Sequence, residues 1–273
     1  MDFDISPILD NWDYESGHVM ARRFVSQKDG QEKIQLRVDL GLLQMNVNGR
    51  PDGRKSGEFD TAFDLHLSRL RKYMDENAGS DDGFTLETEA CIQLKQEAIQ
   101  YHHRYICLLQ MEDYDRVIRD TKRNIKVFDF VDKYAATQEL AWDLNMLRPQ
   151  LLMMQARATA ELHIKADDQD AAVEAVEDGI GRIRGFFEDQ DRLDLMEESD
   201  EIFSLSDWLD ELRNPDFKSD KPRDISLDTT PQPLTKKELL EKEMAEAVER
   251  EDYERAAEVR DELKELENSS ASR

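Results

Sequence analysis

Apolar and polar residues alternate along residues 33–40 with the period of a β-strand, which predicts one buried face. The apolar positions are Ile34, Leu36, Val38 and Leu40. Residues 19–26 predict a partner strand, and Asp29–Gly30 between them is typical of a hairpin turn. After Gly41 the alternation shifts phase, which indicates a bulge or a tight turn at that glycine. We therefore expect antiparallel β structure over residues 18–48.

The hydrophobic period becomes helical after residue 58. One helix is predicted by Phe59, Phe63, Leu67, Leu70 and Met74, and we expect it to cover the sheet. The segment before it, Asn48–Gly53, reads NGRPDG. It is either a functional loop that presents Arg50 or a surface turn, and the surface turn is favoured because such residues usually form turns.

Residues 85–188 follow the pattern of two long helical hairpins. The first has its turn at Met111–Asp113, between helices marked by Cys91, Leu94, Ala98, Tyr101, Tyr105 and Leu108 and by Tyr114, Val117, Ile118, Thr121, Ile125 and Phe128. A third helix starts near Thr137, kinks or restarts at Pro149 and ends near Lys165. The fourth is predicted by Ala172, Val176, Ile180, Ile183 and Phe187.

The segments Asp113–Ile118 and Asp168–Val173 occupy equivalent turns of the two predicted hairpins. Both resemble the turn and second helix of tetratricopeptide (TPR) repeats. Val117 stands where that family usually has alanine, and Gln169 where it usually has an aromatic residue. The turns are 55 residues apart, longer than the TPR repeat of about 34 residues. The resemblance implies a TPR-like bundle with irregular repeats.

An acidic stretch follows the fourth helix. Residues 186–213 contain 11 acidic and 2 basic residues. Within it, Leu205, Trp208, Leu209 and Leu212 predict a short amphipathic helix with Ser206 as N-cap. This helix either binds a partner or caps the bundle, and capping is favoured because a terminal repeat exposes an apolar face. Residues 214–233, rich in proline, predict a flexible linker.

Residues 239–266 contain two short amphipathic helical patterns that break at Glu249–Glu251. This hairpin resembles the UVR motif of excinuclease subunits B and C, and similar hairpins occur in some Clp-type ATPases and their adaptors. The resemblance implies pairing between proteins, self-association included. The residues expected to bind the partner are Met244, Ala247, Tyr253, Ala256, Ala257, Arg260 and Leu263. The whole chain is similar to bacterial proteins that contain a UVR motif.

The predicted fold class is mainly α with a small N-terminal antiparallel β element (α+β). Five segments are expected: a β-sheet plus helix at 1–76, TPR-like hairpins at 85–188, the acidic segment at 189–213, the linker at 214–233, and the UVR-like helical hairpin, of coiled-coil type, at 234–268.

The formal net charge of −25 argues against direct nucleic-acid binding, which needs a positive surface. Cys91 and Cys107 would lie about 24 Å apart on one helix, too far for a disulfide, so a reduced, cytoplasmic location is expected. The N-terminus lacks the pattern of a signal peptide, and no apolar run is long enough to span a bilayer.

Residues that could perform catalysis do not group in this sequence, so no enzyme activity, cofactor or metal is expected. The histidines His18, His66, His102, His103 and His163 lack metal-ligand spacing. The glycines of Gly179–Gly185 have the wrong spacing for nucleotide binding and lie in a helical pattern, where we expect them to allow close helix packing.

One charge pattern needs an explanation. Four basic residues share one helix face: Arg116, Arg119, Arg123 and Lys126, here called the arginine stripe. The stripe is a candidate site for an anion or an acidic partner, a solvated face, or a dock for the acidic segment 189–213. The solvated face is favoured, supported by pairs such as Glu112–Arg116.

These observations favour a non-enzymatic adaptor whose tethered hairpin docks a partner protein. The first alternative is an accessory factor of nucleotide-excision repair that acts through excinuclease subunits B and C or through DNA. The second is a regulator of a Clp-type ATPase, although such adaptors usually carry zinc-binding cysteines that this chain lacks.

Overall fold

The structure is a computed structural model that describes residues 4–15, 18–214 and 259–260. Its contacts divide the chain into two compact units, residues 1–229 and 230–273. The fold class is mainly α with a small N-terminal antiparallel sheet, as predicted. Of the helices described, none has the length and apolar character needed to cross a membrane.

The N-terminal part contains helix α1 (Ser6–Leu9) and strands β1 (Met20–Val25), β2 (Glu32–Val38) and β3 (Gly41–Asn46). The strands form an antiparallel sheet in the order β1-β2-β3. Gly30 adopts φ +68° in the first hairpin turn, where a side chain would be strained. Val38 pairs directly with Gly41, so a tight turn through two residues, and no bulge, explains the phase shift at this glycine.

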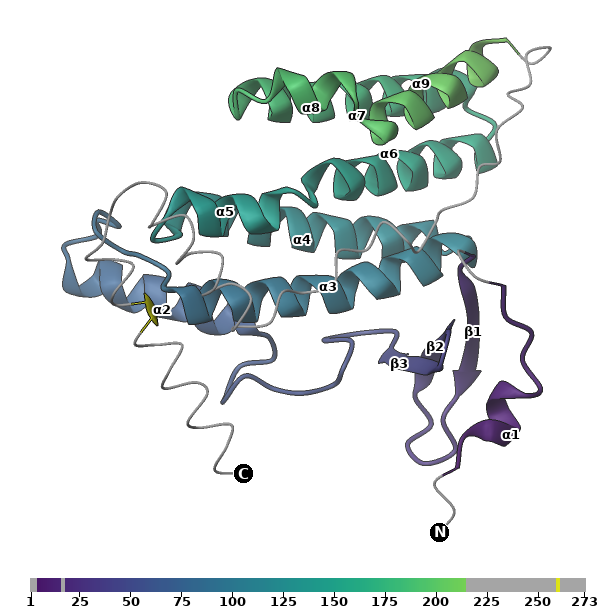
Figure 1. Cartoon of the computed structure of the whole chain (residues 1–273), viewed down its shortest axis with the longest axis horizontal. Coiled ribbons are helices and arrows are strands. Elements are labelled where there is room, and N and C mark those ends of the chain that lie inside the picture. Colours follow the sequence, from purple (N-terminus) through teal and green to yellow (C-terminus); the bar gives the residue numbers. More distant parts are fainter. Residues whose placement is uncertain (1–3, 16–17, 215–258, 261–273) are drawn as a thin grey trace. The chain divides into compact units, whose positions relative to one another are not determined.

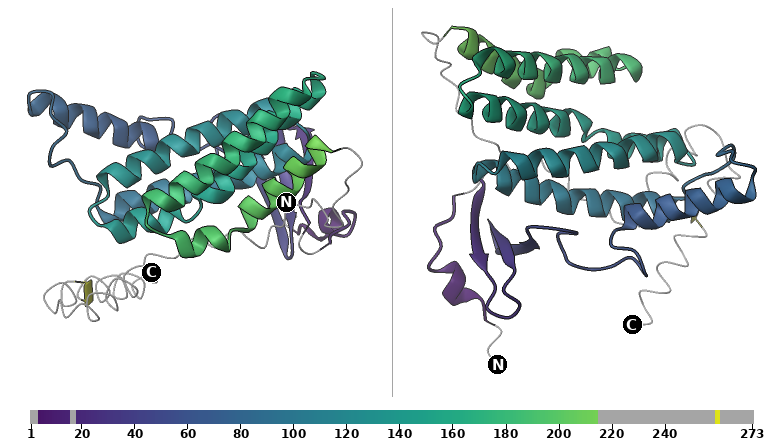
Figure 2. Two further views of the ribbon diagram at one scale, coloured as in Figure 1. Left: turned by 90° about the horizontal axis from the view of Figure 1, so that it is seen from above. Right: turned by 180° about the vertical axis from the view of Figure 1, so that it is seen from behind.

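The helices that follow are α2 (Ala62–Glu76), α3 (Thr88–Gln110), α4 (Tyr114–Tyr134), α5 (Gln138–Asn145), α6 (Arg148–Lys165), α7 (Gln169–Asp189), α8 (Leu193–Glu197) and α9 (Asp200–Arg213). α3 and α4 form one antiparallel hairpin and α6 and α7 another, and α4 packs against α6, so the four helices stack in layers (Figures 1 and 2). The predicted restart near Pro149 is confirmed, because this proline lies in the first turn of α6.

The turns at the two hairpins share one geometry. Glu112 and Asp167 adopt the left-handed conformation, with φ of 56° and 60°. In the first turn the amide of Asp113 donates to the carbonyl of Leu108, and in the second the amide of Asp168 donates to the carbonyl of His163, both at 2.9 Å. These are Schellman closures, which satisfy carbonyls at the end of the preceding helix. The two turns are therefore structurally equivalent, as the sequence predicted.

The sheet packs against one end of α3, whereas α2 lies at the other end (Figures 1 and 2). The expectation that residues 59–74 cover the sheet is therefore wrong. Phe63 of α2 instead contacts Phe130 edge-to-face at 5.5 Å between ring centroids. Phe84 contacts Tyr134 edge-to-face in the same cluster, at 5.3 Å between ring centroids. The apolar face of α2 is thus buried by aromatic side chains from α4 and from the loop before α3.

The acidic stretch forms α8 and α9, and its N-cap differs from the prediction. Ser199, and not Ser206, caps α9 by accepting a hydrogen bond from the amide of Ile202. The helix starts earlier because its apolar spacing continues back to Ile202. Leu205 and Trp208 are buried in the core cluster that α9 shares with α6 and α7. This burial favours the capping interpretation of the Trp208 helix over a free binding motif.

Gly179 lies where α7 crosses α6. A Cβ atom at this position would come within 2.4 Å of the Cβ of Ala156, so only glycine fits without a shift of the helices. Gly181 and Gly185 have open space where a side chain would be. The expectation of close packing is therefore confirmed for Gly179 and wrong for the other two glycines.

Candidate protein-interaction sites

Arg123 is the innermost member of the arginine stripe, and its guanidinium pairs with the carboxylate of Glu97 on α3. Its Cζ lies 4.2 Å from the ring centroid of Tyr101 and 5.7 Å from that of Phe63. Burial lowers the pKa of Arg123, and the nearby Glu97 opposes this effect. Arg123 therefore holds α2, α3 and α4 together and does not present its charge to a partner.

Glu97 is the anion at the centre of this arrangement, and its side chain is fully buried. It accepts hydrogen bonds from the amides of Ala62 at 2.7 Å and Phe63 at 3.4 Å. These amides belong to the first turn of α2, where a helix lacks internal partners and favours negative charge. Arg50 lies 3.4 Å from the same carboxylate. Glu97 thus caps one helix and neutralises two arginines.

The loop NGRPDG is a surface turn, as favoured, because Asn48, Gly49, Asp52 and Gly53 are exposed, but Arg50 points inward. Its Nε lies 3.0 Å from Oδ1 of Asp52, and its Nη1 donates to Oγ of Ser56 at 2.9 Å. Pro51, the next residue, is buried. The alternative in which the loop presents Arg50 is therefore wrong, because Arg50 anchors the surface turn to α3 through Glu97.

Arg104 of α3 and Asp120 of α4 form a second buried pair that the sequence analysis missed. Arg104 Nη1 also donates to the carbonyls of Asn46 at 2.9 Å and Gly49 at 2.7 Å. Arg119 adds a hydrogen bond from Nη2 to the carbonyl of Val47 at 2.9 Å. Two arginines thus donate hydrogen bonds to carbonyls at the end of β3 and just after it. These hydrogen bonds fix the sheet to the hairpin of α3 and α4.

The outer members of the arginine stripe, Arg116 and Lys126, are more exposed than Arg123. Arg116 Nη1 pairs with Oδ2 of Asp113 at 2.6 Å, and Arg23 of β1 contacts the same oxygen at 2.6 Å. Burial raises the pKa of Asp113, but its hydrogen bonds from Arg116 and Arg23 outweigh this and leave that pKa below its usual value. Lys126 is exposed. Three of the four cations in the arginine stripe therefore bind other residues of the same folded unit, residues 4–214.

The acidic segment does not dock on the arginine stripe. α9 packs on α7 and α6 instead, at the far side of the layers from the sheet (Figure 1). Arg157 of α6 lies beneath Trp208, with its Cζ 5.9 Å from the ring centroid, and donates to Ser204 Oγ at 2.7 Å. The docking alternative for residues 189–213 is therefore wrong, because the apolar side of α9 determines where the helix packs.

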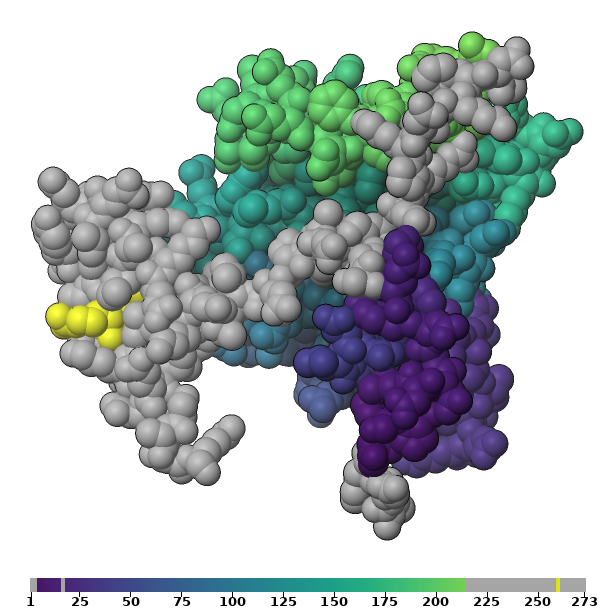
Figure 3. Space-filling model, turned by 45° about the vertical axis from the view of Figure 1, so that its right-hand side comes forward, coloured from purple at the N-terminus to yellow at the C-terminus, as the bar shows by residue number. Residues whose placement is uncertain are grey.

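The surface of this last layer combines acidic residues with exposed apolar ones. Phe203 is 54% exposed and Leu193 is 50% exposed. The layer forms the green surface at the top of Figure 3. Exposed apolar side chains among charged residues are compatible with a protein-binding surface, although single ones are common on any protein.

The buried histidine His102 and the buried cysteines of α3 are held in their neutral forms. His102 donates to or accepts from the Tyr105 hydroxyl at 2.7 Å, and burial lowers its pKa to about 3. Burial raises the pKa of the Cys91 thiol to about 12, and both cysteines are free. Among the residues that the structure describes, no three His, Cys, Asp or Glu side chains converge in a way that could hold a metal ion.

The predicted partner-binding residues of the hairpin lie almost entirely outside the described residues. These are Met244, Ala247, Tyr253, Ala256, Ala257 and Leu263. Arg260 is described; it is helical and exposed, and the adjacent Val259 is helical and buried. Arg260 therefore lies on the polar side of a helix at this point.

Comparison with known proteins identifies a family motif in the segment that contains the predicted hairpin. The family model described as "UvrB/uvrC motif" (UVR) matches residues 235–269. No curated protein and no solved structure matches the chain. The match covers the predicted hairpin and all seven of its proposed contact residues. The chain therefore carries a UVR motif, the UvrB/UvrC motif, at residues 235–269.

Proposed function

We propose that this protein is a non-enzymatic adaptor whose C-terminal UVR hairpin docks a partner protein while the helical body and sheet form a second platform. The observation that carries the proposal is the UVR motif at residues 235–269. Such motifs mediate protein–protein or DNA interactions in excinuclease-related proteins. In this proposal Met244, Tyr253 and Ala256 lie at the docking interface, and the hairpin can also pair with a second copy.

Charge supports a protein partner over direct contact with DNA. Residues 234–273 contain 8 basic and 13 acidic residues, and the whole chain has a formal net charge of −25. Binding to the phosphate backbone depends on clustered cations that release counterions. The arginine stripe supplies few free cations, because Arg116, Arg119 and Arg123 are engaged in contacts with other residues of the same fold.

The stacked antiparallel hairpins support a role for the body as a binding platform. A TPR-like arrangement, which we retain as a prediction, would offer the concave surface that helical repeats use for partners. The free, buried cysteines support a cytoplasmic location, where thiols stay reduced.

The proposal is tested by affinity purification from the native cell with full-length protein and with a chain that ends at residue 233. We expect a defined partner to co-purify with the full-length protein and to be lost from the shortened chain. Identical sets of recovered proteins would contradict a docking role for the hairpin.

A second candidate function is that of an accessory factor in nucleotide-excision repair, favoured by the UvrB/UvrC motif itself. It predicts that excinuclease subunits depend on the hairpin for co-purification, whereas a Clp-type ATPase would indicate a regulator of proteolysis. Direct DNA binding is tested by mobility shift of duplex DNA at physiological salt. A shift that is lost in an Arg116→Ala/Lys126→Ala chain would favour the DNA-binding alternative.

A further inference from the structure

The outer face of the sheet, called here the outer sheet face, carries the polar residues Arg22, Lys33, Gln35, Arg37 and Gln44 beside the apolar residues Met20, Phe24 and Leu42. These side chains share one face because neighbours on a strand alternate, while Ile34 and Leu36 point into the core. Arg22 Nε donates to Gln35 Oε1 at 2.8 Å, and Gln35 Nε2 donates to Gln44 Oε1 at 3.0 Å. The outer sheet face therefore carries three cations beside a bonded row of amides, and one of them, Lys33, lies 3.4 Å from Oδ2 of Asp29.

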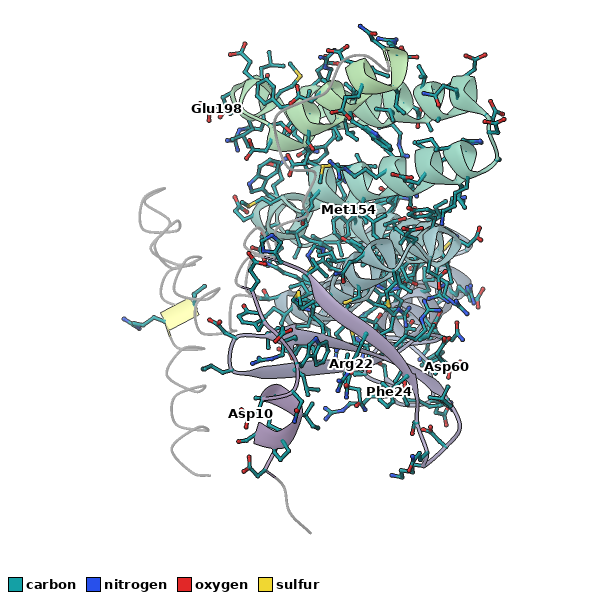
Figure 4. The ribbon with its side chains drawn as sticks, turned by 90° about the vertical axis from the view of Figure 1, so that its right-hand side faces the viewer. Asp10, Arg22, Phe24, Asp60, Met154 and Glu198 are labelled. Carbon is teal, nitrogen blue, oxygen red and sulfur yellow. The ribbon has the colours of Figure 1, made fainter. Side chains whose placement is uncertain are left out.

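The N-terminal segment lies on this face. The Trp12 ring centroid is 4.1 Å from Cζ of Arg22, and that of Tyr14 is 5.0 Å from Cζ of Arg37. Both aromatic residues are half-buried, whereas Asp13 between them is exposed, which is the alternation of an extended chain on a sheet. Figure 4 shows α1, with Asp10 labelled, beside the sheet whose strand β1 carries Arg22 and Phe24.

The segment is held weakly. Its hydrogen bonds are local, such as that from the amide of Trp12 to the carbonyl of Leu9 at 3.1 Å and from Asn11 Nδ2 to the carbonyl of Pro7 at 2.8 Å. Trp12 and Tyr14 contact the sheet through the two ring–guanidinium contacts. Ring–guanidinium contacts at a surface are individually weak, so a competing ligand can displace the segment.

Arg37 is the cation of the outer sheet face that has no counter-ion among the described residues. The residue is only 8% exposed, and Nη1 donates to the carbonyls of Asp39 at 3.0 Å and Gly41 at 3.1 Å. Its Nε is buried without a hydrogen-bond partner, and no carboxylate of the described residues pairs with it. A buried guanidinium is costly without a counter-ion, so an added carboxylate here would be strongly favoured.

We propose that the outer sheet face is a docking surface for an extended acidic segment of a partner protein, which places an aromatic ring on Arg22 and a carboxylate, two positions later, on Arg37. Residues 11–15 occupy this surface as an internal ligand. They supply the ring through Trp12 but place Tyr14, and not a carboxylate, over Arg37. The partner segment therefore binds more tightly than the resident one and displaces it.

The surface is separate from the UVR hairpin and gives the proposed adaptor its second contact. The probes are two fluorescein-labelled peptides, one with the sequence of residues 4–15 and one with the same sequence carrying Tyr14→Glu. Binding is measured by fluorescence polarisation to the full-length protein and to the full-length Trp12→Ala/Tyr14→Ala variant. Circular dichroism confirms that the variant is folded.

We expect the double variant to bind the first peptide at least tenfold more tightly than the wild type does, and the Tyr14→Glu peptide more tightly again. Adding Arg22→Gln to the double variant should weaken binding at least tenfold, whereas Arg54→Gln, an exposed arginine outside the sheet, should not. Equal binding to wild type and double variant, no binding to either, or indifference to Arg22→Gln would overturn the proposal. A Tyr253→Asp chain should bind both peptides as the wild type does, which separates this result from the role of the hairpin.

Hydrogen exchange gives a second test that does not need the double variant. In the otherwise wild-type chain, Arg22→Gln should accelerate amide exchange at residues 11–15 and leave β2 unchanged. Unchanged exchange at residues 11–15 would show that these residues are not held on the sheet by Arg22, and the proposal would fail.

Discussion

Arg104 and Asp120 form a bidentate ion pair between α3 and α4, with Nε to Oδ2 at 2.7 Å and Nη2 to Oδ1 at 2.9 Å. Both side chains are only 1% exposed. Each residue lies eight positions from Glu112 in the turn of the hairpin. The pair therefore lies at matching heights on the two helices and supports the loop after β3 through the remaining guanidinium nitrogen.

The Asp120→Asn variant tests the contribution of this pair. The amide keeps the shape of the carboxylate but leaves the Arg104 charge buried without its counter-ion, which should lower the free energy of unfolding by about 3–5 kcal/mol. Urea unfolding followed by circular dichroism measures the change. Asp115→Asn, at an exposed position on the same helix, is the control and should cost less than about 1 kcal/mol. Equal losses in the two variants would contradict the structural role of Asp120.

Arg123 and Lys126 lie on one side of α4 but should respond differently to truncation. Arg123→Ala removes a counter-ion from buried Glu97 and contacts with two aromatic rings, which should cost about 3 kcal/mol. Lys126→Ala affects an exposed side chain and should stay within about 0.5 kcal/mol. Urea unfolding of the two variants provides the comparison. Similar small effects would restore the solvated-face interpretation for the whole stripe.

Gly179 and Gly181 give a matched pair within α7. Gly179→Ala brings a methyl group against Ala156 and should destabilise the protein by about 1–3 kcal/mol despite the better helix propensity of alanine. Gly181→Ala meets open space and should stabilise it by about 0.5–1 kcal/mol. Thermal unfolding should therefore shift in opposite directions. A shift of the same sign in both variants would argue against the close approach of α6 and α7.

His102 should make stability fall in acid. Burial disfavours the charged ring and lowers the pKa of His102 in the folded state from the usual 6.5 to about 3. Above pH 6.5 the His102 ring is neutral in both the folded and the unfolded chain, so its titration does not change the free energy of unfolding. Below this pH the unfolded chain binds the proton first, so stability falls by about 1.4 kcal/mol per pH unit toward pH 3. His102→Gln should remove this part of the slope between pH 6 and 4.5, measured by urea unfolding at each pH. Parallel pH profiles for wild type and variant would refute the assignment.

The elements were predictable wherever the hydrophobic period was long. Ile34, Leu36 and Val38 predicted β2, and the turn at Met111–Asp113 predicted the first hairpin, because both patterns are local. The start of α9 was missed because Ser199 and Ser206 are equally good caps by residue type. Only the apolar face that extends back to Ile202 distinguishes them.

The contacts of charged residues were harder to predict because they depend on pairing between elements. Arg104 lies among apolar positions of its helix, and a charge on an apolar face indicates a buried partner. In a helical hairpin, residues equally far from the turn lie opposite each other, so the position of Arg104 relative to Glu112 would have indicated Asp120 as the partner. Nothing local indicated that Glu97 accepts from the amides of Ala62 and Phe63, because that contact follows from where α2 packs.

The contacts on the outer sheet face were also not predicted. Trp12 and Tyr14 belong to an acidic N-terminal stretch with no clear hydrophobic period. Their alternation over two residues is too short to indicate a strand. Their role depends on Arg22 and Arg37 being neighbours across the sheet, which requires the strand register.

The central claim, that the UVR motif at residues 235–269 recruits a partner protein, is tested most directly by a point variant in the full-length chain. Tagged wild type, Tyr253→Asp and the control Lys264→Ala, at a position outside the predicted contact residues, are purified from the native cell, and co-purifying proteins are quantified by mass spectrometry. We expect at least one protein to be recovered with wild type and Lys264→Ala and to fall at least tenfold with Tyr253→Asp. Recovery of the same proteins in the same amounts with all three chains would contradict the adaptor function.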